Sequence, residues 1–352
     1  MKRKKQILIS LTISLFLFLF LILPFGISYF VYEDYFENRY EVYEPLSRNI
    51  DEFENLLSEK YTFTSNDGQE LVGYKYFKND VNNNGIVIIS HGLGGGGHNF
   101  YMDVADYLTS NGYVVFAYDA TANGESEGDA VNGLPQGIID LDYAIQFIKN
   151  TDEFKNLPIM LFGHSWGAYS GGSVLNIHPD IKAVVSVAGF NKSTDMLELE
   201  GKKIIGDAIN FLLPYFTAYE RFKFGRYSSY NCIDGYENSD ANIMIIQSSD
   251  DEMIPIDLSF DMYYKKFNDD PSFKFVKLEN RGHNYAYYSD NAKSYRTNFD
   301  SEFVSYLRAS NLDITPEIKA QYLNENLDKT LLYDLDDELM KDIVEFYDNN
   351  IN

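Results

Sequence analysis

Strand-like and helix-like segments alternate along the middle of this chain, and this alternation restricts the fold more than any other feature. Segment 137–150, for example, repeats its apolar residues at helical spacing between two strand-like runs. Strands that alternate with helices run parallel and are buried on both faces of their sheet. The strand-like runs are GIVIIS (85–90), YVVFAYD (113–119), PIMLFG (158–163), AVVSVAG (183–189), NIMIIQSS (242–249) and FKFVKLEN (273–280). The sequence therefore predicts an α/β fold with a mostly parallel sheet and helices on both faces.

Other segments precede, interrupt and follow this pattern. Alternating runs on either side of Asp67-Gly68 predict a hairpin that opens the globular domain, which we place at 61–310. Within that domain, about 191–240 has helical periodicity and no strand, which predicts a helical cap inserted over the edge of the sheet. Beyond it, residues 311–352 are acidic and have helical spacing. We expect a C-terminal helical extension that packs on the domain.

The N-terminus has the composition of a membrane anchor. Residues 1–5, MKRKK, are basic, and the apolar stretch over 6–32 carries no charge before Glu33. It is long enough to cross a hydrocarbon core of ~30 Å, it exceeds the ~7 to 15 apolar residues of a cleaved signal, and it has no alanine for a cleavage site. We expect a single-pass signal anchor in the cell membrane, with 1–5 in the cytoplasm, 33–60 as a juxtamembrane segment and the globular domain on the extracytoplasmic side.

Charge and cysteine content exclude several classes of protein. The formal net charge is −24, whereas nucleic-acid binding needs clustered Lys and Arg against phosphate. The single cysteine, Cys232, cannot form an intramolecular disulfide, and a cysteine-based zinc site has no other support. We expect no nucleic-acid partner, no cysteine-based zinc site, and a buried, unreactive Cys232.

The stretch GHSWG, residues 163–167, directly follows one of the strand-like runs and precedes a helix rich in small residues. A nucleophile elbow turns strand into helix within a few residues, which leaves no room for side chains at Gly163 and Gly167. Such a turn exposes the serine at its centre beside a helix N-terminus, where developing negative charge is tolerated. The context predicts that Ser165 is a nucleophile.

A serine hydroxyl needs a neighbouring base, usually histidine, to accept its proton. The chain has five histidines: His91, His98, His164, His178 and His283. His164 lies inside the elbow, His91 and His98 flank a glycine run, and His178 falls near the far end of the helix that follows the elbow. Only His283 follows the last predicted strand, where sites in such sheets assemble. We therefore predict that His283 is the base.

The imidazole in turn needs a carboxylate that orients it. Strand 242–249 ends at Asp250, Asp251 and Glu252, and the chemistry of all three fits that role.

The segment HGLGGGGH after the first parallel strand offers backbone N–H groups for an oxyanion. We predict that the amide of Leu93, or next that of Gly94, acts with the amide of Trp166 as an oxyanion hole. A phosphate-binding loop is the alternative, but the Lys-Ser/Thr of a P-loop does not follow these glycines.

These motifs, in the order strand-HGLG, strand-GHSWG, strand-DDEMIP and strand-GH, resemble the α/β-hydrolase superfamily over roughly residues 60–310. The arrangement is similar to the monoacylglycerol-lipase-like and serine-aminopeptidase-like group, which includes lysophospholipases and esterases. The resemblance implies an α/β-hydrolase fold with no cofactor and no metal. It also implies that Asp251 is the acid, because the acid of such enzymes precedes a proline by four positions, here Pro255. The run GLGGGG is richer in glycine than the family pattern.

The resulting prediction is a membrane-anchored serine hydrolase that cleaves carboxylic esters, such as lysophospholipids or monoacylglycerols, through Ser165, His283 and Asp251. Peptidases, thioesterases and acyltransferases share these motifs, and an inactive binding protein of the same fold is the alternative from a different class. Apolar cap residues either form an acyl pocket or pack the cap on the sheet; they are Ile204, Ile205, Phe211, Leu212, Leu213, Tyr215 and Phe216.

Overall fold

The structure is a computed structural model that describes residues 2–79, 81, 83–94 and 97–351. Gly95 and Gly96 of the predicted glycine-rich loop, and Met1 and Asn352 of the predicted end segments, lie outside the described residues.

An eight-stranded sheet forms the centre of the molecule, in the order β1-β2-β4-β3-β5-β6-β7-β8. The β1-β2 and β2-β4 pairs are antiparallel, and all the others are parallel. The strands are β1 (Leu57–Thr64), β2 (Glu70–Phe77), β3 (Gly85–Ser90), β4 (Tyr113–Tyr118), β5 (Ile159–His164), β6 (Ala183–Val187), β7 (Asn242–Ser248) and β8 (Phe273–Leu278). The predicted α/β architecture with a mostly parallel sheet is confirmed.

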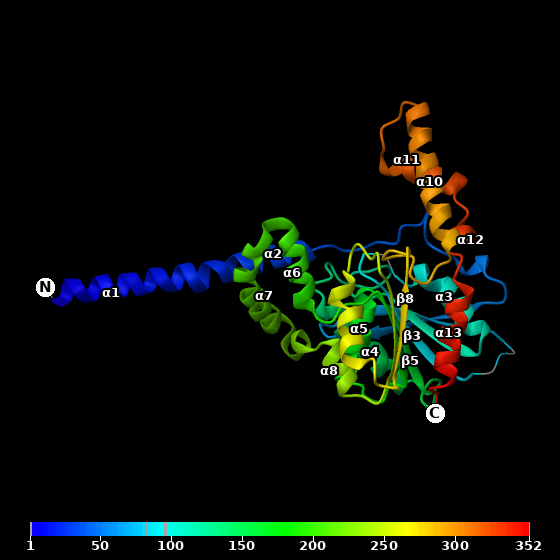
Figure 1. Cartoon of the computed structure of the whole chain (residues 1–352), viewed down its shortest axis with the longest axis horizontal. Helices are drawn as coiled ribbons and strands as arrows, with labels where there is room; N and C mark the ends of the chain where they lie inside the picture. The colour runs from blue at the N-terminus through cyan, green and yellow to red at the C-terminus, as the bar shows by residue number, and fades with distance from the viewer. Residues whose placement is uncertain (1, 80, 82, 95–96, 352) are drawn as a thin grey trace.

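Helices cover both faces of the sheet, which explains why β3 to β6 are buried along their whole length. One face packs against α4 (Pro135–Asn150), α5 (Trp166–Val174), α8 (Cys232–Glu237) and α9 (Phe260–Phe267). The other packs against α3 (Met102–Ser110) and α13 (Asp337–Asp348). Figure 1 shows α4, α5 and α8 on one side of the strands and α3 and α13 on the other. Successive strand residues alternate between these two cores.

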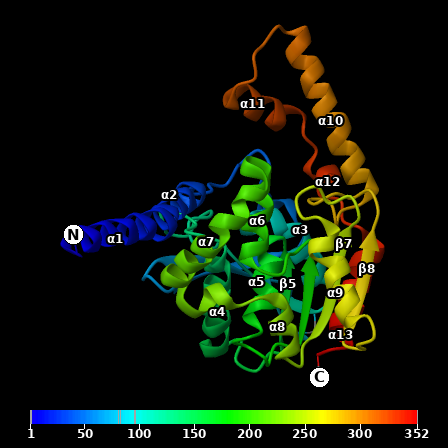
Figure 2. The same ribbon diagram turned by 60° about the vertical axis from the view of Figure 1, so that its left-hand side comes forward.

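The C-terminal segment divides into two parts. Helix α10 (Asp290–Ala309) and α11 (Pro316–Asn326) project away from the sheet, as Figures 1 and 2 show. After α12 (Lys329–Leu332) the chain returns to the sheet as α13, whose Met340, Ile343 and Tyr347 are fully buried. The Tyr347 hydroxyl also donates to the carbonyl of Leu161 in β5, at 2.8 Å. Helix α13 therefore belongs to the hydrophobic core on the same face of the sheet as α3.

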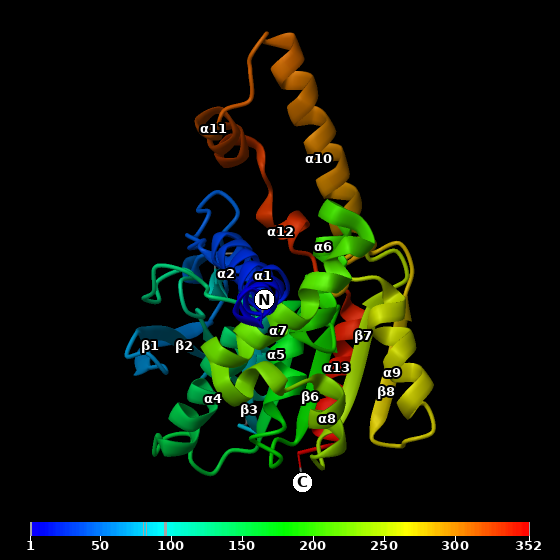
Figure 3. The same ribbon diagram turned by 90° about the vertical axis from the view of Figure 1, so that its left-hand side faces the viewer.

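The segment between β6 and β7 contains α6 (Ser193–Ile205), α7 (Ile209–Phe224) and α8. α6 and α7 pack on each other. They lie on the side of the domain from which the N-terminal helix projects (Figure 3). We call α6 and α7 the cap. Cys232, at the start of α8, is 1% exposed, and burial raises the pKa of its thiol to about 11.

A continuous N-terminal helix runs through α1 (Lys2–Leu17), a π-helical turn η1 (Phe18–Ile22) and α2 (Leu23–Phe36). Its section Arg3–Phe36 is long and apolar enough to cross a membrane, and little of it is buried. The π-helical turn η1 lies next to Pro24. Because Pro24 has no N–H, the carbonyl of Phe20 lacks its usual helical donor. The hydroxyl of Tyr215 in α7 donates to that carbonyl instead.

The end of α2 is joined to the cap by buried polar contacts. The hydroxyl of Tyr32 donates to Glu220 Oε1 at 2.7 Å, and the hydroxyl of Ser193 donates to the same oxygen. The next residue of α2, Glu33, accepts from Tyr219 at 2.6 Å and pairs with Lys223. The helix end and the cap therefore form one packed unit.

This junction should be sensitive to pH through Glu220. Burial raises the pKa of Glu220 to about 7, although hydrogen bonds from Ser193 and Tyr32 oppose the rise. Because about 4.3 is the pKa in an unfolded chain, the stabilisation from this group is complete below about pH 4 and is lost as the pH rises through 7. We expect the Tm of the full chain to fall more between about pH 5 and 8 than that of Glu220→Gln. Equal falls would contradict this assignment.

Candidate active site

Ser165 occupies a sharp turn between β5 and α5. Its φ is 56° and its ψ is −114°, a conformation that non-glycine residues rarely adopt. The two flanking glycines allow this turn: a Cβ on Gly163 would collide with the backbone of Gly167, and one on Gly167 would collide with the carbonyl of Ser90. The strain is held by packing and by a hydrogen bond from the Ser165 amide to the carbonyl of Val187, at 2.8 Å. The predicted strand-turn-helix geometry is present.

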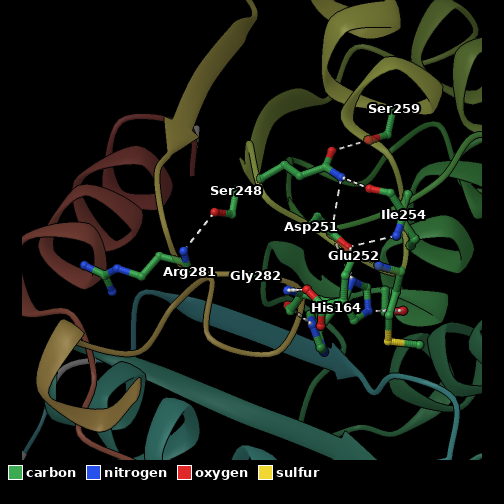
Figure 4. A network of polar contacts seen from close by, with 12 residues as sticks. His164, Ser248, Asp251, Glu252, Ile254, Ser259, Arg281 and Gly282 are labelled. Atoms are coloured by element: carbon green, nitrogen blue, oxygen red, sulfur yellow. Dashed lines mark hydrogen bonds and ion pairs between the residues drawn. The ribbon is translucent and has the colours of Figure 1, made fainter. Parts of the chain in front are cut away.

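His283 and Asp251 lie beside this serine, on the loops after β8 and β7. Nε2 of His283 is 2.9 Å from Oγ of Ser165. Its Nδ1 is 2.9 Å from Oδ2 and 3.1 Å from Oδ1 of Asp251. Oδ1 of Asp251 also accepts the amides of Met253, at 3.0 Å, and Ile254, at 2.8 Å. Figure 4 shows Asp251 in this polar network. His283 is buried, with 2% of its surface exposed.

The other two acidic residues of the cluster contact the backbone of the histidine loop. Asp250 accepts the amide of Gly282 at 3.0 Å, and Glu252 accepts the amide of His283 at 3.2 Å. Hydrogen bonds from Ser248 and Gly282 outweigh burial and lower the pKa of Asp250 to about 2. Both carboxylates thus hold the loop that carries His283, a role that sequence reasoning missed because it depends on β7 and β8 being neighbours.

A second polar chain joins the glycine-rich loop to the histidine loop. The amide of Gly92 donates to the hydroxyl of Tyr101 at 2.8 Å, and that hydroxyl lies 3.0 Å from Nδ1 of His164. Nε2 of His164 lies 3.2 Å from the carbonyl of His283. Burial, with the nearby His283, lowers the pKa of His164 to about 3, so its ring is neutral, with Nε2–H as donor and Nδ1 as acceptor. Sequence reasoning did not identify Tyr101, which carries no motif.

The remaining histidines serve other sites. His91 is buried between the carbonyl of Gly92, at 2.8 Å, and the amide of Ala120, at 2.9 Å. His98 donates from its backbone and from Nδ1 to Asp119, at 2.7 and 2.8 Å. These two histidines fasten both ends of the glycine-rich loop to the residues after β4. His178 bonds to Asp142 at 2.7 Å, away from Ser165.

The two predicted oxyanion donors belong to the same site. Leu93 and Trp166 line the cavity that contains Ser165. Among the described residues, neither backbone amide donates to a protein acceptor. The indole N–H of Trp166 points elsewhere and donates to the carbonyl of Leu134 at 2.8 Å. Gly94, the alternative donor, has φ +83° and also lines the cavity.

A cavity of about 930 Å³ surrounds Ser165, and most of its lining is apolar. Of the apolar cap residues identified in the sequence, Ile204 and Phe216 line this cavity, Ile205 and Phe211 face outward, and Leu212 and Leu213 pack partly against the core. In the part of the chain that the structure describes, no group of His, Cys, Asp and Glu side chains is arranged to hold a metal ion.

Comparison with known proteins agrees with this architecture. Residues 81–231, less than half of the chain, match the family model described as serine aminopeptidase, S33. A monoglyceride lipase homolog of monkeypox virus is 31% identical over 96 residues, which are 27% of this chain and 34% of that protein. The chain thus matches about a third of the length of this relative.

Solved structures extend the likeness to most of the chain. The esterase Pf2001 of Pyrococcus furiosus is 16% identical, with a TM-score of 0.54 over 87% of this chain and 97% of that one. The acylaminoacyl peptidase of Pyrococcus horikoshii is 16% identical, with a TM-score of 0.53 over 86% of this chain and 43% of that one. At these identities the likeness concerns the fold. Together with the sheet topology and the family match, it shows that this chain has the α/β-hydrolase fold.

Proposed function

We propose that this α/β-hydrolase of the esterase and lipase kind is a membrane-anchored serine hydrolase that cleaves carboxylic esters of apolar acyl groups. The observation that carries the proposal is the unbroken series of contacts from Ser165 Oγ through His283 to Asp251, with 2.9 Å at each step. Ser165 is half-buried in its turn and lines an apolar cavity. A serine is a competent nucleophile when a base is within about 2.6 to 3.2 Å and a third group orients that base.

The chemistry follows from these contacts. Oγ of Ser165 attacks the acyl carbon while Nε2 of His283 accepts the hydroxyl proton. Asp251, which contacts Nδ1, keeps that nitrogen protonated and stabilises the imidazolium. The amides of Leu93 and Trp166 donate to the oxygen that becomes negative in the tetrahedral intermediate. His283 then returns its proton to the departing alcohol, and water releases the acid from the acyl-enzyme.

The cavity supports an acyl substrate. Its volume of about 930 Å³ lies at the upper end of small-molecule sites, and its walls expose few charges. Burying an aliphatic chain is favourable by about 0.8 kcal/mol per CH₂. An ester with a long acyl chain therefore fits better than a polar substrate.

The N-terminal helix supports the membrane anchor. Its apolar side chains from Ile7 to Phe20 are exposed in the structure, which is unfavourable in water and favourable in a bilayer. The basic residues before it favour the cytoplasmic side, so the catalytic domain would lie outside.

Labelling with a fluorophosphonate probe tests the proposal. The full chain in detergent should be labelled, and Ser165→Ala should lose the label and the hydrolysis of p-nitrophenyl esters. Labelling that survives Ser165→Ala would overturn the proposal. Cleavage of aminoacyl anilides without cleavage of esters would make the enzyme a peptidase instead.

A further inference from the structure

The last turns of the N-terminal helix form part of the wall of the active-site cavity. Val31, Tyr32, Tyr35 and Phe36 of α2 line it together with Ile204 of α6. Tyr32 and Phe36 are buried, whereas Val31 is 49%, Tyr35 47% and Ile204 74% exposed. A residue that lines a cavity and also faces outward marks its rim. The cavity therefore has a mouth between α2 and α6.

This wall is fastened to the domain on both sides. Towards the cap, Tyr32 bonds to the buried Glu220. Just after α2, the guanidinium of Arg39 donates to the carbonyls of Gly124 at 2.7 Å, Ser126 at 2.8 Å and Gly128 at 3.0 Å, in the loop after β4. With both fastenings in place, the end of α2 is a fixed part of the site and not a free linker.

The contact between Tyr215 and the Phe20 carbonyl sets the depth of the cap relative to the anchor. From Gln6 to Phe20 the helix rises about 21 Å, at about 1.5 Å per residue. A hydrocarbon core that starts at Gln6 extends about 30 Å. Tyr215 thus meets the helix about 9 Å inside the outer boundary of that core. If the helix is tilted, it rises less along the membrane normal, and this contact lies deeper in the hydrocarbon core.

The polarity of the exposed side chains also changes along α7. Its start is apolar and outward-facing, with Phe211 52% exposed, and Ile205 at the end of α6 is 45% exposed. Its far end is charged, where Lys223 pairs with Glu33 at the end of the predicted span. Figure 1 shows α7 beside α2, with α1 extending beyond the cap. Apolar side chains thus face outward where α6 ends and α7 begins, and an ion pair joins the far end of α7 to α2.

We propose that the tip of the cap, residues 204–211 where α6 ends and α7 begins, is seated in the outer leaflet of the bilayer. Substrate then reaches Ser165 from that leaflet, through the mouth between α2 and α6. The proposal rests on the proposed esterase function and specifies its substrate as an acyl lipid already in the membrane. The acyl chain passes between Val31 and Ile204, so the anchor is part of the substrate site. A depth of about 9 Å is within the 5–10 Å typical of interfacial helices.

The lipid leaflet that contacts the cap tip is neutral or zwitterionic. With a net charge of −24, the chain has no long-range attraction to anionic lipid. The lysines near the tip, Lys202 and Lys203, are paired with Glu198 and Glu200. The apolar side chains at the tip therefore supply the binding energy.

The experiment uses the full chain in phosphatidylcholine vesicles. Val31→Trp and Ile204→Trp narrow the mouth. Ile314→Trp is the matched control, because Ile314 is 65% exposed, a value between those of Val31 and Ile204, and does not line the cavity. Hydrolysis of palmitoyl monoacylglycerol in the vesicles is compared with that of soluble p-nitrophenyl butyrate. The mouth variants should lower the lipid-to-butyrate ratio of kcat/KM by about tenfold or more, and the control should leave it unchanged.

A ratio that stays the same in the mouth variants and in Ile314→Trp would overturn the route. Depth is tested separately by quenching with brominated phosphatidylcholine, where Phe211→Trp should be quenched and the exposed Phe222→Trp at the other end of α7 should not. Equal quenching would overturn the seating of the cap. Activity that survives Ser165→Ala would instead refute the proposed function, which keeps the two failures distinguishable.

Discussion

Replacing Asp251 with asparagine should reduce kcat for p-nitrophenyl esters by about 10⁴-fold with little change in stability. The carboxylate contacts Nδ1 of His283 through both oxygens, and an amide of the same size would present an N–H to that nitrogen. The imidazole would then change tautomer and place a proton on Nε2, facing Ser165, where it cannot accept the serine proton. The measurement is steady-state kinetics of the full chain in detergent.

Asp250→Asn is the matched control for this change, because it removes a neighbouring charge of the same cluster. The asparagine carbonyl can still accept the amide of Gly282, so the loop should keep its shape and kcat should fall less than about tenfold. Glu252→Gln should behave in the same way through the amide of His283. A larger loss of kcat in Asp250→Asn than in Asp251→Asn would show that Asp250, and not Asp251, orients His283.

Replacing Gly167 with alanine should destabilise the fold by about 3 kcal/mol and abolish labelling of Ser165. The new methyl group would overlap the backbone carbonyl of Ser90, which cannot move without shifting β3 against α5. Unfolding in urea can be followed through Trp166, the single tryptophan of the chain, which is 2% exposed.

Gly171→Ala, in the same helix, separates this steric effect from helix propensity. A methyl group there would make only ordinary contacts with Val184 and Leu161. Alanine is favoured over glycine inside a helix by about 0.5 to 1 kcal/mol, so this variant should be as stable as the wild type or more so. If both alanine variants have the same free energy of unfolding, the close approach at Gly167 is not what requires glycine there.

Local patterns in the sequence were sufficient to predict the sheet. Runs such as 85–90 and 158–163 are apolar without interruption because both faces of a parallel strand are buried. Chain order and the ends of these strands were also sufficient to select Ser165 and His283 as a candidate pair. The structure brings the two side chains within hydrogen-bonding distance. Their catalytic roles stay predictions until the kinetics above are measured.

The sequence by itself thus determined the elements of the fold and the chemical types available at the carboxyl edge of the sheet, because both depend on local periodicity and on strand order. Only the tertiary structure decided which carboxylate contacts His283, that α13 completes the second core, and that α2 lines the cavity. Tyr32 and Glu220 are 188 residues apart, and Tyr347 and Leu161 are 186 apart. Contacts of such separation follow from how whole elements pack, and they produce no periodic pattern along the chain.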